Sequence, residues 1–340
     1  MTQEQPISIL TALHGQSIIL PDLNAILDGW PREVNQNLDR LRHDVDEWLG
    51  SAMSHSPKLE TLKAADFGYF GATWWPRATY ERLRIVTFLA AWLFVWDDVV
   101  VFPEIDMDNG SLWDNFELSN PYRNETREYV QYCLSLTSEP DIGPVKTVNA
   151  TIQAFETIGT AIRKVYNFEQ RKRFMNYMED FLEMSQQEQM LRLRGTLPSL
   201  EEFWLYRPGS SAVHVTIALN EFAWDNKSLP TSVMEDGDMK LLWDYTNVII
   251  STVNDIVSLK KEIARGSISS MIPLLYARSR DAQVAVDQTA EFLVVNVKAF
   301  EETAQRLLKQ EKRHNVEEAR ELRAFIKGCQ FYCSGNLTWR

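Results

Sequence analysis

The feature that most constrains the fold is the helical spacing of apolar residues. Between positions 167 and 194 they recur at a spacing that places them on one side of an α-helix: Phe174, Tyr177, Met178, Phe181 and Leu182. Similar patterns predict helices over 77–101, 200–222, 238–265, 281–308 and 316–331. No useful length of sequence alternates apolar and polar residues as a strand does. The sequence therefore predicts an all-α fold with about ten or more helices.

The composition agrees with this fold class. The chain has 340 residues, of which 45% are hydrophobic, enough to close a sizeable core. Glycine-rich phosphate loops and nucleophile-elbow motifs are missing from the sequence, which argues against most α/β enzymes. We expect one domain over 1–340, with an irregular, proline-containing N-terminal arm over 1–30 and a long polar loop over 103–127. A glycine at position 266 predicts the end of the helix over 238–265.

Charge and cysteine content exclude several classes of partner. The formal net charge of −12 is opposite to that of a typical nucleic-acid binder, so we expect no nucleic-acid partner. The three cysteines do not form a disulfide framework or a zinc-ligand pattern. No secretory signal is visible, and the longest apolar run, 85–96, is too short to span a bilayer. These features predict a cytoplasmic protein without a membrane span, either a monomer or a homodimer.

The first candidate site is the pair Asp97-Asp98, which ends the apolar run FLAAWLFVWDD. Carboxylates that follow such a run are partly desolvated, which is costly unless a cation neutralises them. The pair therefore indicates a cation site. The alternative is that the two carboxylates end a core helix and point into solvent.

The second candidate site is the segment VNDIVSLKKEIARG, which places Asn254, Ser258 and Glu262 at intervals of four residues. At about 100° per residue these side chains share one side of a helix. An amide, a hydroxyl and a carboxylate are hard oxygen donors of the kind that Mg²⁺ takes. Lys261 lies beside Glu262 and within reach of a bound anion. The alternative is an ordinary polar helix face.

The third candidate is Arg207, which precedes Pro208 and Gly209 in FWLYRPGSSAVHV. Proline and glycine break or bend a helix, and an arginine at such a break suits an anion. Taken alone, Arg207 is more typical of a surface or salt-bridged residue. With the two acidic clusters it indicates metal ions that bridge protein oxygens to a phosphate group. Trp92 and Phe94, near the aspartates, are candidates to line an apolar cavity.

These motifs resemble those of class I terpene cyclases, and specifically of fungal sesquiterpene synthases. The metal motif [ND]-D-x-x-[ST]-x-x-[KR]-E of that family is matched in full from Asn254 to Glu262. The Asp-rich motif is matched by Asp97 and Asp98, but Val101 stands where the family usually has a carboxylate. The segments WWPRATYERLRIVTFLAAWLFVWDD, GQSIILPDL and GNLTW also resemble this group, so the likeness spans nearly the whole chain.

The resemblance implies a single helical bundle of the class I terpenoid synthase type around an apolar, aromatic-lined pocket. Asp97 would coordinate two of three Mg²⁺ ions, and Asn254, Ser258 and Glu262 would hold the third, with Mn²⁺ able to substitute. Asp98 more often faces a salt bridge in this family. Arg207 and Lys261 would contact the diphosphate, and Trp92 and Phe94 would line the pocket.

The implied activity is Mg²⁺-dependent ionisation and cyclisation of an isoprenyl diphosphate. Farnesyl diphosphate would give a sesquiterpene hydrocarbon or alcohol, with release of diphosphate. One alternative is a chain-elongating prenyltransferase, which would carry a second Asp-rich motif; another is a catalytically degenerate helical binding protein. The family commonly has an Arg-Tyr pair shortly after GNLTW, and the given sequence ends at Trp339-Arg340, which leaves truncation or absence of that pair open.

Overall fold

The computed structural model describes residues 6–53, 58–101, 112, 115–136, 145–224, 229–310 and 315–339, except the side chains of 98–101 and 310. Helices and no strands are found in this described part of the chain. In chain order they are α1 (Pro6–Leu13), α2 (Leu23–Ile26), α3 (Leu38–Ala52), α4 (Leu59–Ala64), α5 (Phe67–Trp74), α6 (Tyr80–Val101), α7 (Phe116–Cys133), α8 (Ala150–Gln153), α9 (Phe155–Val165), α10 (Phe168–Leu193), α11 (Leu200–Ser210), α12 (Val213–Ile217), α13 (Asn220–Ala223), α14 (Thr231–Met234), α15 (Gly237–Ala264), α16 (Met271–Ser279), α17 (Ala282–Gln310) and α18 (Val316–Trp339). The predicted all-α class is confirmed.

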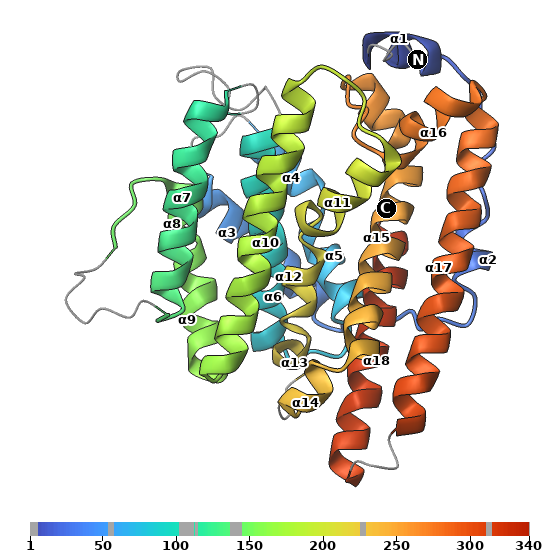
Figure 1. Ribbon diagram of the computed structural model, residues 1–340. Helices are drawn as coiled ribbons and strands as arrows, with labels where there is room; N and C mark the ends of the chain where they lie inside the picture. The colour runs from blue at the N-terminus through green and yellow to red at the C-terminus, as the bar shows by residue number, and fades with distance from the viewer. Residues whose placement is uncertain are drawn as a thin grey trace.

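The long helices run roughly side by side along the molecule, and α1 lies across one end (Figure 1). Helix α15 packs against α17 and α18, α10 packs against α11, and α5 packs between α3, α6 and α18. This arrangement brings α11, α15 and α16 together, although they come from separate parts of the second half of the chain. The candidate site described below is built where these three helices meet.

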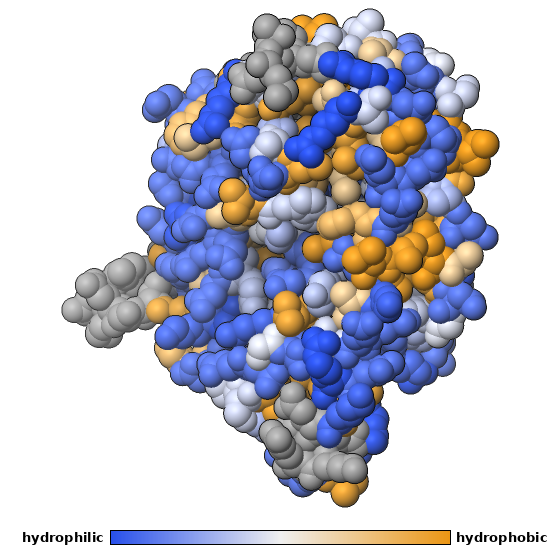
Figure 2. Space-filling model, turned by 45° about the vertical axis from the view of Figure 1, so that its right-hand side comes forward, coloured by the Kyte–Doolittle hydropathy of each residue, from blue (hydrophilic) through white to orange (hydrophobic). Residues whose placement is uncertain are grey.

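Apolar side chains from most of these helices share one hydrophobic core. Its largest fully buried side chains include three tryptophans, Trp75, Trp92 and Trp96. The face shown in Figure 2 is mainly hydrophilic, with hydrophobic residues gathered in patches. No helix in the described ranges combines the length and the apolar character that crossing a membrane requires.

The predicted helix over 200–222 is broken, and this break shapes the site. Helix α11 ends at Ser210, Ala212 takes the left-handed conformation with φ of 57°, and α12 begins at Val213. A left-handed non-glycine residue costs roughly 1–2 kcal/mol, so the surrounding contacts must hold it. Gly209 permits a close approach to α10, because a Cβ atom there would lie 2.2 Å from Met184 Cγ.

Two expectations for irregular structure were wrong in part, since residues 14–22 and 27–30 of the N-terminal arm are irregular as expected but other parts are helical. The N-terminal arm contains α1 and α2, because Pro6 occupies the first position of α1, where a missing N–H costs nothing, and Asp22 caps α2. Of the loop expected over 103–127, residues 116–127 lie in α7 with Pro121 inside the helix, and 103–111, 113 and 114 lie outside the described residues. Burial of the inner face of α7 outweighs the one helix hydrogen bond that Pro121 removes.

The end of α15 follows the sequence prediction. Helix α15 ends at Ala264, and Gly266 has a positive φ of 76°. The Ser267 N–H donates to the Glu262 carbonyl oxygen at 2.9 Å, which closes the last turn. The turn therefore holds the backbone around Glu262 directly before the chain turns toward α16.

Candidate active site

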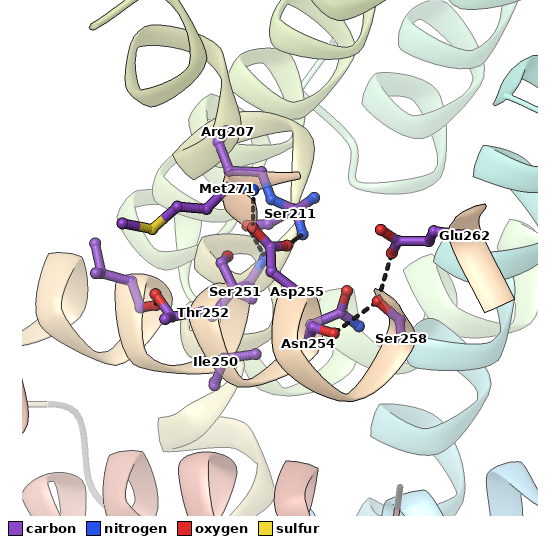
Figure 3. Close-up of polar contacts among 12 residues, drawn as sticks. Arg207, Ser211, Ile250, Ser251, Thr252, Asn254, Asp255, Ser258, Glu262 and Met271 are labelled. Atoms are coloured by element: carbon purple, nitrogen blue, oxygen red, sulfur yellow. Dashed lines mark hydrogen bonds and ion pairs between the residues drawn. The ribbon is translucent and has the colours of Figure 1, made fainter. Parts of the chain in front are cut away.

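The three predicted oxygen donors lie together on α15. The Ser258 hydroxyl lies 2.6 Å from the Asn254 carbonyl oxygen and 2.5 Å from Glu262 Oε1 (Figure 3). A hydroxyl has one proton, so Ser258 donates to one of these acceptors at a time. The other carboxylate oxygen, Glu262 Oε2, is buried and makes no hydrogen bond within the described residues. The structure thus leaves a buried acceptor uncommitted at this end of α15.

Arg207 reaches this region from the last turn of α11. Its Nη2 donates to Asp255 Oδ1 at 3.0 Å, and the second oxygen, Asp255 Oδ2, accepts the Met271 N–H at 2.8 Å (Figure 3). The Arg207 side chain is 16% exposed and the Asp255 side chain 1% exposed. The Arg207 Nε is buried and has no hydrogen-bond partner among the described residues. One carboxylate therefore ties together α11, α15 and the first residue of α16.

Burial and charge oppose one another in this ion pair. Burial disfavours the charged guanidinium of Arg207, but the carboxylates of Asp255, Glu188 and Glu262 outweigh burial and raise its pKa. Burial raises the pKa of the Asp255 carboxyl, and Arg207 opposes that rise. Arg207 is therefore a permanent cation in a field of carboxylates.

The polar side of α15 extends further back than the sequence analysis recognised. Asn247 Oδ1 accepts hydrogen bonds from Ser211 Oγ at 2.9 Å and from Ser251 Oγ at 3.1 Å. Asn247 Nδ2 donates to the Pro208 carbonyl oxygen at 2.6 Å. Asn247, Ser251 and Asp255 are spaced by four residues in an apolar-looking run, and that spacing was the signal that could have found them.

The second acidic site lies at the end of α6. Asp97 is half-buried, and it lies close enough to Arg123 on α7 to favour the charged form of that arginine. The side chains of Asp98 and Val101 lie outside the described residues. Asp97 therefore remains a predicted metal ligand.

Arg123 is a buried cation with neutral hydrogen-bond partners. Its side chain is 1% exposed and donates to oxygens of Ser119, Ser185 and Gln189 at 2.8 to 3.2 Å. Burial and, to a lesser extent, the nearby charge of Arg192 lower the pKa of Arg123 to about 10, against the opposing effect of Asp97. The Asp97 side of the site thus contains a positive charge whose hydrogen bonds, among the described residues, go to neutral oxygens.

The two rings predicted to line the pocket have different surroundings. The Trp92 indole N–H donates to the Thr151 carbonyl oxygen at 2.7 Å, and its ring packs on Phe155 at a centroid distance of 5.1 Å. Five residues of helix separate Trp92 from Asp97, which places them about 140° apart. The structure therefore places Trp92 in the core beside α8 and α9.

Phe94 is half-buried and belongs to an aromatic cluster with Phe67, Phe70 and Trp339. The ring centroids of its three neighbours lie 5.3 to 5.9 Å from the Phe94 ring.

Lys261, expected at the diphosphate, is exposed in the last turn of α15. The roles predicted for Phe94 and Lys261 stay predictions.

The donor set on α15 suits a hard divalent cation. The described residues contain no group of three or more His, Cys, Asp or Glu side chains arranged to hold a metal. The α15 donors instead combine an amide, a hydroxyl and a carboxylate, and Glu262 Oε2 is buried without a partner. Mg²⁺ commonly takes few protein ligands and shares the others with water and substrate oxygens. These residues therefore fit such an ion.

Comparison with known proteins agrees with this geometry. Residues 89–299 match the family model described as terpene synthase family 2, C-terminal metal binding. Sesquiterpene cyclase hepA from Aspergillus oryzae is 34% identical over 94% of this chain and 86% of its own length. Germacrene A synthase from Nostoc punctiforme is 25% identical over 91% of this chain and 90% of its own length. A solved structure of hedycaryol synthase with nerolidol has a TM-score of 0.74 at 20% identity, over 95% of this chain and all, 100%, of that one.

Proposed function

This chain belongs to terpene synthase family 2, and we propose that it ionises and cyclises an isoprenyl diphosphate, with farnesyl diphosphate as the preferred substrate. One of the similar proteins, hepA, is named a sesquiterpene cyclase, and another is named germacrene A synthase. The predicted product is a sesquiterpene hydrocarbon or alcohol, released with diphosphate.

A pair of uncommitted buried atoms of opposite character carries this proposal. Glu262 Oε2 is a buried acceptor without a donor, and Arg207 Nε is a buried donor without an acceptor. The Glu262 carboxylate acts on the charge of Arg207, so the two groups share one electrostatic environment. A cation bound to a multiply charged anion satisfies both atoms at once, since the cation meets the carboxylate and the anion meets the guanidinium. A metal diphosphate has this chemistry.

Asn254, Ser258 and Glu262 would hold one Mg²⁺ ion, and Asp97 would hold others from α6. Bound Mg²⁺ supplies a Lewis acid that stabilises negative charge on the departing diphosphate. Glu262 Oε1 is an acceptor for the Ser258 hydroxyl, whereas Oε2 makes no hydrogen bond among the described residues. The number of ions, three by analogy with the family, is part of the proposal.

Arg207 would bind the diphosphate through donors that Asp255 does not use. Asp255 occupies Nη2, whereas Nε stays available. The allylic C–O bond breaks, both electrons leave with the diphosphate oxygen, and Arg207 stabilises the negative charge that develops there. The remaining allylic cation is closed into a ring by a distant double bond of the same chain. Loss of a proton or capture of water then ends the reaction.

The aromatic cluster around Phe94 would protect and stabilise the cation. Ring faces attract positive charge, and apolar rings exclude the water that would quench the cation before cyclisation. Phe94, Phe67, Phe70 and Trp339 come from α5, α6 and α18, so three helices contribute to this part of the proposed pocket. Trp92 is left out because its contacts lie in the core beside α8 and α9.

The test is incubation with geranyl, farnesyl and geranylgeranyl diphosphates and MgCl₂, followed by gas chromatography–mass spectrometry of the volatile products. We expect cyclic C15 products from farnesyl diphosphate and none in EDTA. Turnover that persists fully in EDTA would overturn the metal assignment. Longer prenyl diphosphates in place of volatiles, after addition of isopentenyl diphosphate, would indicate chain elongation instead.

A further inference from the structure

The arginine that we propose to bind diphosphate is held by helix α15. Two side chains of α15, Asp255 and Asn247, contact the segment from Arg207 to Ser211, where α11 breaks. They stand eight residues apart, which is about two helical turns, and their side chains point about 80° apart around the helix axis. Neither is one of the three predicted metal donors. Their contacts are directed at the helix break.

Asp255 restrains Arg207 without occupying all its donors. One of its carboxylate oxygens accepts a hydrogen bond from Arg207 Nη2, and the other accepts one from the Met271 N–H. A carboxylate that only neutralised an arginine would more typically bind it in the bidentate way. Because Asp255 is fully buried and anchored to the start of α16, it fixes one corner of the guanidinium. Nε is left buried and without a partner in the described chain.

Asn247 restrains the backbone that carries Arg207. Its amide donates to the Pro208 carbonyl oxygen and accepts from the Ser211 hydroxyl, so it contacts both sides of the break. Ser251 donates to the same Asn247 oxygen and orients the amide. Ala212 follows in the left-handed conformation, which is unfavourable for alanine. The amide of Asn247 therefore helps to hold a strained turn in place.

We infer that Asp255 and Asn247 are positioning residues, which act on the substrate diphosphate through Arg207. The inference rests on the proposed function, because it takes the diphosphate as the ligand of Arg207. It also predicts the direction in which diphosphate affinity changes when Asp255 is replaced. If Asp255 merely competed with diphosphate for the guanidinium, its removal would tighten diphosphate binding; if it positions Arg207, its removal weakens binding.

The experiment is a double-mutant cycle of Asp255→Asn with Arg207→Gln in the full chain. Binding of inorganic diphosphate with MgCl₂ is measured by titration calorimetry, and kcat and KM are measured with farnesyl diphosphate. We expect Asp255→Asn to weaken diphosphate binding by about tenfold when Arg207 is present and by less than about twofold when it is replaced. KM should rise with the dissociation constant, and circular dichroism of each variant checks that the fold is kept.

The chain offers a matched control in Asp66. This carboxylate also joins an arginine, Arg42, to a backbone N–H at the start of a helix, that of Tyr69 in α5. Asp66→Asn keeps a residue type that tolerates both the left-handed conformation and the N-cap position found there. We expect its diphosphate binding to stay within about twofold of wild type.

The role of Asn247 is tested with the variant Asn247→Leu, and Thr252→Val serves as its control. Thr252 is a buried residue of the same helix, and its hydroxyl donates to the Val248 carbonyl oxygen of that helix. Asn247→Leu should raise KM and Thr252→Val should not. This arm carries the test if Asp255→Asn does not fold.

The outcomes separate the inference from the function on which it rests. Tighter or unchanged binding in Asp255→Asn, or an equal loss in both Arg207 backgrounds, overturns the positioning role while the function stands. Wild-type protein that neither binds magnesium diphosphate nor turns over farnesyl diphosphate overturns both.

Discussion

Two arginines lie beside the two predicted metal motifs, the largely buried Arg207 and the fully buried Arg123, and their surroundings differ. Arg207 donates directly to a buried carboxylate, Asp255, whereas among the described residues Arg123 donates to hydroxyl, amide and carbonyl oxygens. Carboxylates raise the pKa of Arg207, whereas burial lowers the pKa of Arg123 to about 10.

The difference shows that the two arginine charges are stabilised differently, one by a carboxylate and the other by neutral groups. On the α15 side, the cation is balanced by its own carboxylate before any ligand binds. On the α6 side, the positive charge of Arg123 is solvated by neutral dipoles and acts on Asp97 from a distance. The α15 side is thus the more fully assembled of the two in the described structure.

The largest expected effects test whether α15 donors and Asp97 act on one ion cluster. Asn254→Ala, Glu262→Ala and Asp97→Ala should each lower kcat/KM by roughly 10²- to 10³-fold, because each removes a group that stabilises transition-state charge. Asp255→Asn should be milder, at about tenfold, since its side chain points to Arg207. Steady-state kinetics at saturating Mg²⁺ measures all four. Equal losses at Asp255 and at the α15 donors would mean that the donor row is not the determinant.

The next effect concerns stability and separates the two arginines. Arg207→Met leaves the Asp255 carboxylate buried without its cation, which should lower the free energy of unfolding by about 3–5 kcal/mol. Arg123→Met leaves neutral partners unpaired, which should cost about 1–3 kcal/mol. Urea denaturation at pH 7.5 compares the two variants with wild type. The reverse order would show that Arg207 is not charge-balanced by Asp255.

A pH series sharpens the same comparison. Burial raises the pKa of Asp255, and loss of Arg207 removes the interaction that opposes this rise. In Arg207→Met the carboxyl is therefore favoured in its protonated form, so the variant loses stability as pH rises through that raised pKa. The difference from wild type should shrink between pH 8 and pH 5.5, whereas for Arg123→Met it should stay level. A gap that widens at low pH would contradict this assignment.

The smallest effect distinguishes the two rings of α6. A ring face near a carbocation is worth about 0.5–2 kcal/mol, so Phe94→Leu should change product ratios by roughly 2- to 30-fold. Trp92→Leu should instead lower stability, toward the roughly 3–5 kcal/mol that full truncation of a buried aromatic costs. Gas chromatography and thermal denaturation measure the two readouts. Unchanged products in Phe94→Leu would remove this ring from the proposed pocket.

Local patterns predicted much of the fold. The apolar spacing over 167–194 and 238–265 predicted α10 and α15 to within a residue or so, and Gly266 predicted the end of α15. Such signals depend on side chains within a few turns of one another. The break in the helix predicted over 200–222 was missed. Ala212 takes the left-handed conformation there, and its neighbours Pro208 and Ser211 are held by Asn247 on α15, a contact that no local sequence pattern predicts.

By itself, the sequence determined the helical class, the family resemblance and the row of Asn254, Ser258 and Glu262, because a spacing of four residues always returns to one side of a helix. Only the tertiary structure decided the partner of Arg207, since Asp255 is 48 residues away in the chain. It also separated Trp92 from Phe94. Helix α6 is apolar on nearly all sides there, so the spacing of its apolar residues does not predict which residues each ring contacts. Those contacts are determined by tertiary packing.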